Sequence, residues 1–160
     1  MPIMGFIRLK QRKNASGTVV SYGYIVSPYW NTNLQSPRQK VLGYAGKVFV
    51  CDVVTDIRLL GYSFSDLLRR ELLRHGFVFR DCMYTLGDLC VTETRVYSLC
   101  SGKKIVLQIH AGFLCDYTLA KLFSLHTPSD AKIFAKDLQL CGISVTPEEF
   151  VKVWENYTHG

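Results

Sequence analysis

Residues 6–26 read FIRLKQRKNASGTVVSYGYIV, and this stretch predicts how the fold begins. Its first eight residues alternate, with Ile7 and Leu9 on one side and basic residues on the other. Alternation with a period of two is typical of a β-strand that turns one face toward a core. Residues 14–17 predict a turn, and residues 18–26 are rich in β-branched and aromatic residues. We therefore expect a hairpin with a basic outer face formed by Arg8, Lys10 and Arg12.

The next segment predicts a third strand. Residues 27–37 hold two prolines and two asparagines, which indicates a loop. Residues 38–44 read as a strand with Arg38 and Lys40 on the same side. Residues 48–51 either extend this strand or begin another after an interruption by glycines. The first fifty residues are thus expected to form a three-stranded antiparallel sheet.

The remaining chain mixes helices and strands. Residues 65–75 predict the clearest helix, with Ser65 as its N-cap and Gly76 as its stop. A short strand is expected at residues 77–79 and a second β-hairpin from residues 91–99 and 103–110.

Helical patterns follow toward the C-terminus. They predict helices at residues 116–125, with Asp116 as its cap, from Thr127-Pro128 to Gly142, and from Pro147 to about Asn156. The fold class is therefore α+β. Residues 1–50 are expected to be a basic β-sheet module and residues 51–160 an α+β domain, unless the two form one continuous domain.

Charge is distributed unevenly along the chain. The net charge is +6, yet all 13 acidic residues lie at or after Asp52. Residues 1–50 therefore carry a charge of +7, whereas residues 51–160 carry −1. A surface that only keeps a protein in solution normally mixes both signs, so this asymmetry indicates a dedicated anion-binding surface.

The basic sheet predicts a nucleic-acid interface. A β-sheet or ribbon can lie in the major groove of DNA while lysine and arginine contact phosphates. Tyrosines on the sheet can donate to phosphates or stack on unpaired bases. Double-stranded DNA is the expected partner. The expected binding residues are Arg8, Lys10, Arg12, Lys13, Tyr22, Tyr24, Arg38, Lys40 and Lys47.

Three runs in this region carry a resemblance to a known family: FIRLKQRK at residues 6–13, YGYIV at residues 22–26, and SPRQKVLGYAGK at residues 36–47. Together they resemble the N-terminal region of DDE insertion-sequence transposases over about residues 5–48. In that family the segment precedes the catalytic domain and is thought to help bind DNA. The resemblance implies DNA binding and an origin in a mobile element or virus, and it does not imply transposase activity.

Two other functions are consistent with the sequence. A Mg²⁺-dependent nuclease needs carboxylates to hold its metal, often with a lysine beside them, and Asp88, Glu93 and Lys103 loosely fit this pattern. A nucleic-acid packaging or assembly protein would use the same basic face. Of the histidines, His75 is expected to cap a helix and His110 to end a buried strand.

The cysteines, the N-terminus and the lack of a long apolar run indicate where the protein is located. The six cysteines show no zinc-finger spacing, and we expect buried free thiols in a reducing compartment. The N-terminus lacks the features of a signal peptide, and no apolar run approaches the roughly 20 residues needed to cross a bilayer. These observations predict an intracellular protein that does not insert into membranes. Its C-terminal helices are expected to pack in the core or to form a homodimer.

Overall fold

The computed structural model describes residues 5–52, 54–124 and 130–159, and it has the α+β fold expected from the sequence. A five-stranded sheet has the order β1-β2-β3-β8-β9, and a second sheet has the order β4-β5-β6-β7. The strands of the larger sheet are β1 (Phe6–Lys13), β2 (Val19–Asn31), β3 (Ser36–Cys51), β8 (Ile105–Ile109) and β9 (Gly112–Leu114). The smaller sheet contains β4 (Val78–Arg80), β5 (Met83–Leu86), β6 (Leu89–Val91) and β7 (Val96–Ser98).

The hairpin of β1 and β2 forms as predicted, and the next hairpin, formed by β2 and β3, is longer than predicted. The expected loop at residues 27–37 is wrong, because β2 continues to Asn31 and β3 already begins at Ser36. Both prolines of that segment lie within the paired strands. Pairing of β2 with β1 ends at Val26, so at Pro28 the strand has a neighbour on one side only, and proline is tolerated on such edge strands.

Strand β3 joins the two halves of the chain into one sheet. It pairs antiparallel with β2 and then, from Lys47 to Cys51, parallel with β8. Residues 48–51 therefore extend the third strand, and the sheet crosses the boundary that we expected after residue 50.

The predicted hairpin of residues 91–99 with 103–110 forms only around its turn, where the Ser98 N–H donates to the Lys103 carbonyl, and its longer pairing is wrong. Strands β7 and β8 meet only at an isolated bridge between Tyr97 and Lys104, while β8 pairs with β3 and β9. The reason lies in burial, because Ile105, Val106 and Leu107 are buried consecutively. A strand covered on both faces is a continuous apolar run, which is typical of the inside of a sheet and not of a surface hairpin.

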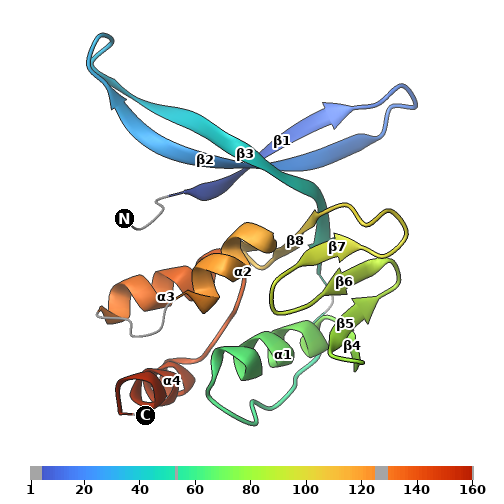
Figure 1. Ribbon diagram of the computed structural model, residues 1–160, viewed down its shortest axis with the longest axis vertical. Coiled ribbons are helices and arrows are strands. Elements are labelled where there is room, and N and C mark those ends of the chain that lie inside the picture. The colour runs from blue at the N-terminus through green and yellow to red at the C-terminus, as the bar shows by residue number, and fades with distance from the viewer. Residues whose placement is uncertain (1–4, 53, 125–129, 160) are drawn as a thin grey trace.

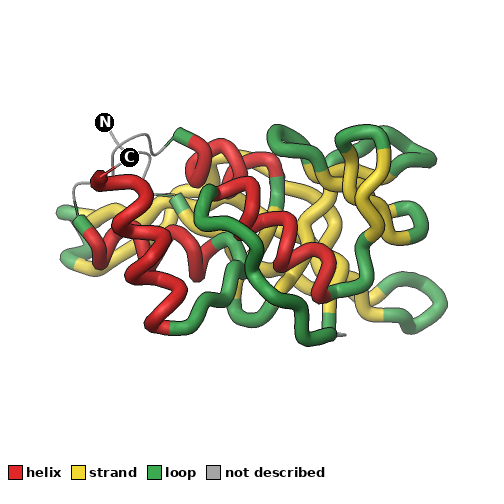
Figure 2. The backbone as a smooth tube through the Cα atoms, turned by 90° about the horizontal axis from the view of Figure 1, so that it is seen from below, coloured by secondary structure: helices red, strands yellow, loops and turns green. Residues whose placement is uncertain are grey.

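The four helices of the described residues lie beneath the long hairpins of β1, β2 and β3 in Figure 1. Figure 2 shows the same helices from below, in front of the strands. They are α1 (Phe64–Arg74), α2 (Asp116–Phe123), α3 (Ala131–Leu140) and α4 (Pro147–His159). Within the described residues, none of them is long and apolar enough to span a membrane.

Two predicted N-caps are wrong. Ser63, and not Ser65, caps α1, because its hydroxyl accepts from the Asp66 N–H while the Asp66 carboxylate accepts from the Ser63 N–H. Cys115, and not Asp116, caps α2, because Asp116 lies inside the helix. The Asp116 carboxylate instead accepts from the Val96 N–H at 2.6 Å.

The other two helix starts have different outcomes. Before α4, Thr146 and Glu149 form the predicted reciprocal cap. The expected helix start at Thr127-Pro128 lies outside the described residues, and α3 is capped by Asp130.

The main core lies between the helices and the sheets. Phe134 of α3 is fully buried, and its ring centroid lies 5.6 Å from that of Phe150 and 5.8 Å from that of Trp154. The packing role that we expected for the side chains of α4 is therefore confirmed. A smaller apolar cluster on the other face of the sheet contains Ile7, Val48 and Val106.

Candidate nucleic-acid interface

The strand register places cations and tyrosines on one face of the outer sheet, by which we mean strands β1, β2 and β3. Arg8 lies opposite Tyr24 and Lys10 opposite Tyr22 on β1 and β2. On β3, Lys47 lies opposite Tyr22 and Tyr44 opposite Tyr24. Residues that are directly paired across two strands share a face of the sheet. We call this surface the basic tyrosine face; it consists of Arg8, Lys10, Arg12, Tyr22, Tyr24, Tyr44 and Lys47.

Contacts within this face hold its side chains side by side. The ammonium of Lys10 lies 5.1 Å from the Tyr24 ring centroid, and the Arg12 guanidinium lies 6.0 Å from that of Tyr22. The Tyr24 and Tyr44 rings are 5.3 Å apart. Partial burial and the neighbouring tyrosines Tyr24 and Tyr22 raise the pKa of Tyr44, so its phenol stays a hydrogen-bond donor at neutral pH.

The opposite face of the same strands is anchored to the body of the protein. Ile7 is buried, and together with Leu9 and Ile25 it packs into the cluster around Val48 and Val106. Gly23 lets this face approach closely, since a Cβ there would lie 3.1 Å from a Val106 methyl carbon. The basic tyrosine face is therefore supported from behind, and its cations remain exposed.

Strand β3 carries the basic tyrosine face to the edge of the main core. The Lys47 ammonium lies 5.4 Å from the ring centroid of Phe49, two residues further along the same face. Phe49 is itself packed against the helix-covered core. The basic tyrosine face therefore adjoins the main core at Phe49.

The outer part of the second hairpin, residues 27–40, divides the predicted cations between two faces. Lys40 lies opposite Ser27 and Arg38 opposite Tyr29. Arg38 and Lys40 share a side as predicted, but alternation along β2 places that side opposite the basic tyrosine face. Alternation along β1 likewise separates Lys13 from its neighbour Arg12.

Two irregularities in β3 accompany this division. The register of β2 and β3 shifts between Gly23 and Tyr24, and again between Ile25 and Val26. Bulges of this kind bend a strand and increase its twist. Beyond them the two-stranded ribbon projects away from the helices, as Figure 1 shows. Trp30 near its tip is 61% exposed.

The electrostatic prediction depends on exposure, and all seven cations are exposed: Arg8, Lys10, Arg12, Lys13, Arg38, Lys40 and Lys47. No carboxylate precedes Asp52 in the sequence, and none of these cations forms an ion pair within the part of the chain that the structure describes. Arg8 donates to the side chain of Gln39 at 2.7 Å. The seven positive charges are thus unopposed at close range.

The candidate nuclease residues do not form one site. Asp88 precedes β6, where Leu89 pairs with Ser98, whereas Glu93 follows the other end of β6, where Val91 pairs with Val96. The whole of β6, Leu89–Val91, therefore lies between the two carboxylates. Lys103 lies at the Asp88 end, since its carbonyl accepts from the Ser98 N–H at 2.9 Å.

Both carboxylates have structural partners. Hydrogen bonds from Ser98 and Cys100 lower the pKa of Asp88, so this carboxylate is engaged in closing the turn after β7. Glu93 accepts from the Ser65 hydroxyl at 2.7 Å.

Sequence reasoning missed two features. Tyr44 belongs to the basic tyrosine face, and only the shifted register of β3 places it there. Glu71, His75 and His110 converge in space, although the sequence assigned both histidines purely structural roles. Within the described residues, this is the only group of at least three histidine, cysteine or acidic side chains that lie close enough together to hold a metal ion.

Comparisons with protein-family models, with curated proteins and with solved structures found no match. The resemblance of residues 5–48 to transposase N-terminal regions therefore stays a prediction.

Proposed function

We propose that the protein binds nucleic acid, with double-stranded DNA as the preferred form, through the basic tyrosine face and the outer hairpin. The observation that carries this proposal is the set of seven exposed cations on a sheet without a carboxylate. Each cation that neutralises a phosphate releases condensed counterions, which is the main source of affinity in sequence-independent binding. Tyrosine hydroxyls beside the cations add hydrogen-bond donors for phosphate oxygens.

Because the cations lie on two faces, this surface fits binding inside a DNA groove better than binding flat against the outside of the duplex. The major groove of B-DNA, about 12 Å wide, admits a two-stranded β-ribbon and places phosphates on both of its sides. Arg38 and Lys40 lie on one face of the ribbon of β2 and β3. Arg8 of the neighbouring strand β1 donates to Gln39 on the other face, so each side of the ribbon has a cation beside it. Phosphate contacts of this kind position a protein but do not read sequence, so we expect weak sequence preference.

A salt titration with matched variants tests the proposal. The test variant is Lys10→Gln with Lys47→Gln, and the control is Lys132→Gln with Lys136→Gln on α3, which removes the same charge from exposed positions far from the outer sheet in sequence. Binding of a fluorescently labelled DNA duplex is followed by anisotropy at several salt concentrations, and a single strand of equal length tests the preference for duplex.

Counterion release sets the expected size of the effect. Each lost phosphate contact removes about 0.9 from the slope of log affinity against log salt, so the test variant should lose roughly 1.8. At about 0.1 M salt this corresponds to a loss of affinity of roughly 60-fold. The control should keep the slope of the wild type. Equal losses in both variants, or a wild-type affinity that does not depend on salt, would overturn the proposal.

A further inference from the structure

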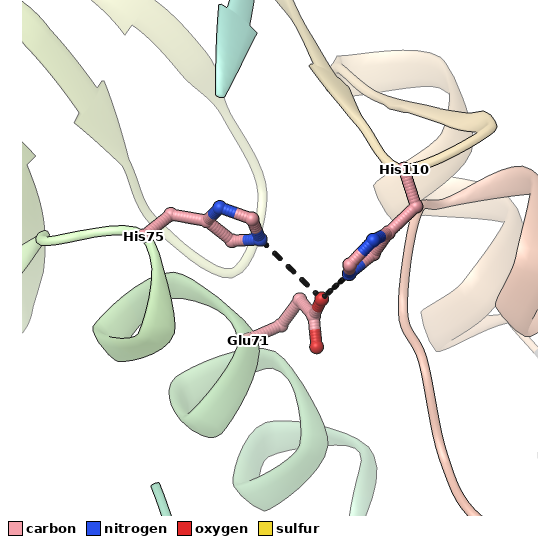
Figure 3. Close-up of side chains that lie close together, drawn as sticks. All are labelled: Glu71, His75 and His110. Carbon is pink, nitrogen blue, oxygen red and sulfur yellow. Dashed lines mark hydrogen bonds and ion pairs between the residues drawn. The ribbon is translucent and has the colours of Figure 1, made fainter. Parts of the chain in front are cut away.

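Glu71, His75 and His110 meet at the junction of helix α1 and the larger sheet. Glu71 and His75 are four residues apart and therefore share one side of the last turn of α1. His110 comes from the two-residue turn between β8 and β9. Figure 3 shows both imidazole rings turned toward the carboxylate of Glu71. Two distant segments thus aim three potential ligands at one point.

The distances within the trio are close to those of a metal site. Glu71 Oε1 lies 3.5 Å from His75 Nε2 and 2.6 Å from His110 Nε2, and one ligand atom from each residue lies within 4.8 Å of the others. Ligands at about 2.0–2.1 Å from a tetrahedral Zn²⁺ lie roughly 3.3 Å apart. The first distance already fits, and the second fits after the His110 ring retreats by roughly 0.7 Å.

His75 provides independent evidence for a ligand. Its side chain is nearly fully buried, at 1% exposure, yet neither ring nitrogen makes a hydrogen bond among the described residues. The Glu71 carboxylate, 3.5 Å from Nε2, forms an ion pair with the ring only if the ring is protonated. A buried polar group without a partner is unfavourable and rare in folded proteins. Coordination of a metal by Nε2, which already points at the Glu71 carboxylate, accounts for this burial.

The turn that carries His110 is held in a strained conformation. His110 has a φ of +53°, in the left-handed region that residues with a side chain seldom occupy. The turn packs directly on the end of α3, since a Cβ on Gly112 would lie 2.1 Å from the Gln139 carbonyl oxygen. Strain that the surrounding structure maintains in this way is concentrated at functional sites.

The carboxylate is oriented by a neighbour. The Arg74 guanidinium donates to the other carboxylate oxygen, Oε2, at 3.1 Å, which leaves Oε1 directed at the two rings. Partners of this kind fix the orientation of metal ligands. The carboxylate is therefore held in position before any metal binds.

One member of the trio, His110, reaches solvent, while Glu71 and His75 are buried. The His110 side chain is 39% exposed and borders a groove of about 890 Å³ between the end of α3 and the start of α4. Zinc sites with three protein ligands keep a fourth position for water or another small ligand, whereas purely structural zinc sites have four protein ligands.

We propose that Glu71, His75 and His110 form a binding site for a divalent transition-metal ion, with Zn²⁺ as the preferred ion. The two imidazoles and one carboxylate supply three ligands, and the position on the groove side of His110 accepts a water molecule or another oxygen ligand. The site is independent of the basic tyrosine face, so this proposal does not rest on DNA binding.

Titration of the full chain with Zn²⁺ alone tests the site. The expected result is one tightly bound equivalent by calorimetry and a rise in melting temperature of roughly 5–10 °C at a free Zn²⁺ concentration about 100-fold above Kd. The variant His110→Asn is informative because asparagine tolerates the left-handed backbone region better than most residues do. Glu71→Gln changes the charge of a second ligand and nearly preserves its shape.

Each variant should weaken Zn²⁺ binding by at least about tenfold, since even the loss of a residue that only orients a ligand has an effect of this size. The control is Cys82→Ser with Cys100→Ser, which removes the exposed thiols and should bind Zn²⁺ as the wild type does. The proposal is overturned if wild type shows no Zn²⁺-dependent rise in melting temperature, if binding survives both ligand variants, or if the cysteine control abolishes it. Destabilisation of the metal-free variants, together with a wild type that ignores Zn²⁺, would identify a hydrogen-bonded network instead.

Discussion

Substitution of Gly46 by alanine tests the junction between the outer hairpins and the body of the protein. Gly46 immediately precedes the residues of β3 that pair with β8, and its φ is +140°. A methyl group at this position would lie 2.6 Å from the Lys104 carbonyl oxygen and 2.7 Å from the Ile105 Cα. Both contacts are with backbone atoms, so no change of rotamer can relieve them.

The magnitude follows from two contributions. A residue with a side chain in this backbone region costs about 1–3 kcal/mol, and forcing an extra carbon into a packed site costs about 1–3 kcal/mol more. The free energy of unfolding should therefore fall by about 2–6 kcal/mol in Gly46→Ala. At about 2–4 °C per kcal/mol for a chain of this size, the melting temperature should drop by roughly 4–24 °C.

Gly43, three residues earlier on the same strand, supplies the control. It has no left-handed φ, and no atom lies within 4 Å of the position that a Cβ would take. Gly43→Ala should change the free energy of unfolding by less than about 1 kcal/mol. Thermal unfolding followed by circular dichroism compares the two variants. Equal melting temperatures would refute the close contact between β3 and the segment that leads into β8.

Two further predictions concern titratable groups. Of the six cysteines, only Cys82 and Cys100 are exposed, so a thiol reagent should label two thiols in the folded protein at pH 8 and six after unfolding. Among the buried thiols, burial raises the pKa of Cys141 to about 12. Rapid labelling of more than two thiols in the folded protein would contradict the fold. Although burial opposes its ionisation, the hydrogen bond from Arg70 lowers the net pKa of Glu149. This carboxylate therefore stabilises the fold above its ordinary pKa of about 4.3 and loses that contribution as pH falls through the lowered value. Glu149→Gln should reduce stability at pH 7 and leave it nearly unchanged at pH 2 in chemical unfolding; an equal loss at both values would contradict this assignment.

Local features were predictable from the sequence because short-range interactions decide them. Alternation in residues 6–13, the turn before Val19 and the capping pair of Thr146 and Glu149 each depend on residues a few positions apart. The charge asymmetry is a property of composition, and exposure of the cations follows from the cost of burying a charge. The α+β class and the basic outer hairpins could therefore be expected without a structure.

The tertiary structure alone decided the arrangements that join distant segments. Parallel pairing of β3 with β8 brings together residues more than fifty positions apart. The sequence of neither strand indicates which strand it pairs with. The first shift in register places Tyr44 on the basic tyrosine face, opposite Tyr24, and a local pattern cannot reveal a bulge that depends on the neighbouring strand.

The trio of Glu71, His75 and His110 shows the same limit. His110 reaches Glu71 only because β8 passes beside the end of α1, whereas in sequence the two residues are 39 positions apart. The sequence thus shows which residues could bind a metal ion. It does not show that they converge on one point, because only tertiary packing sets the distances between segments that local interactions do not connect.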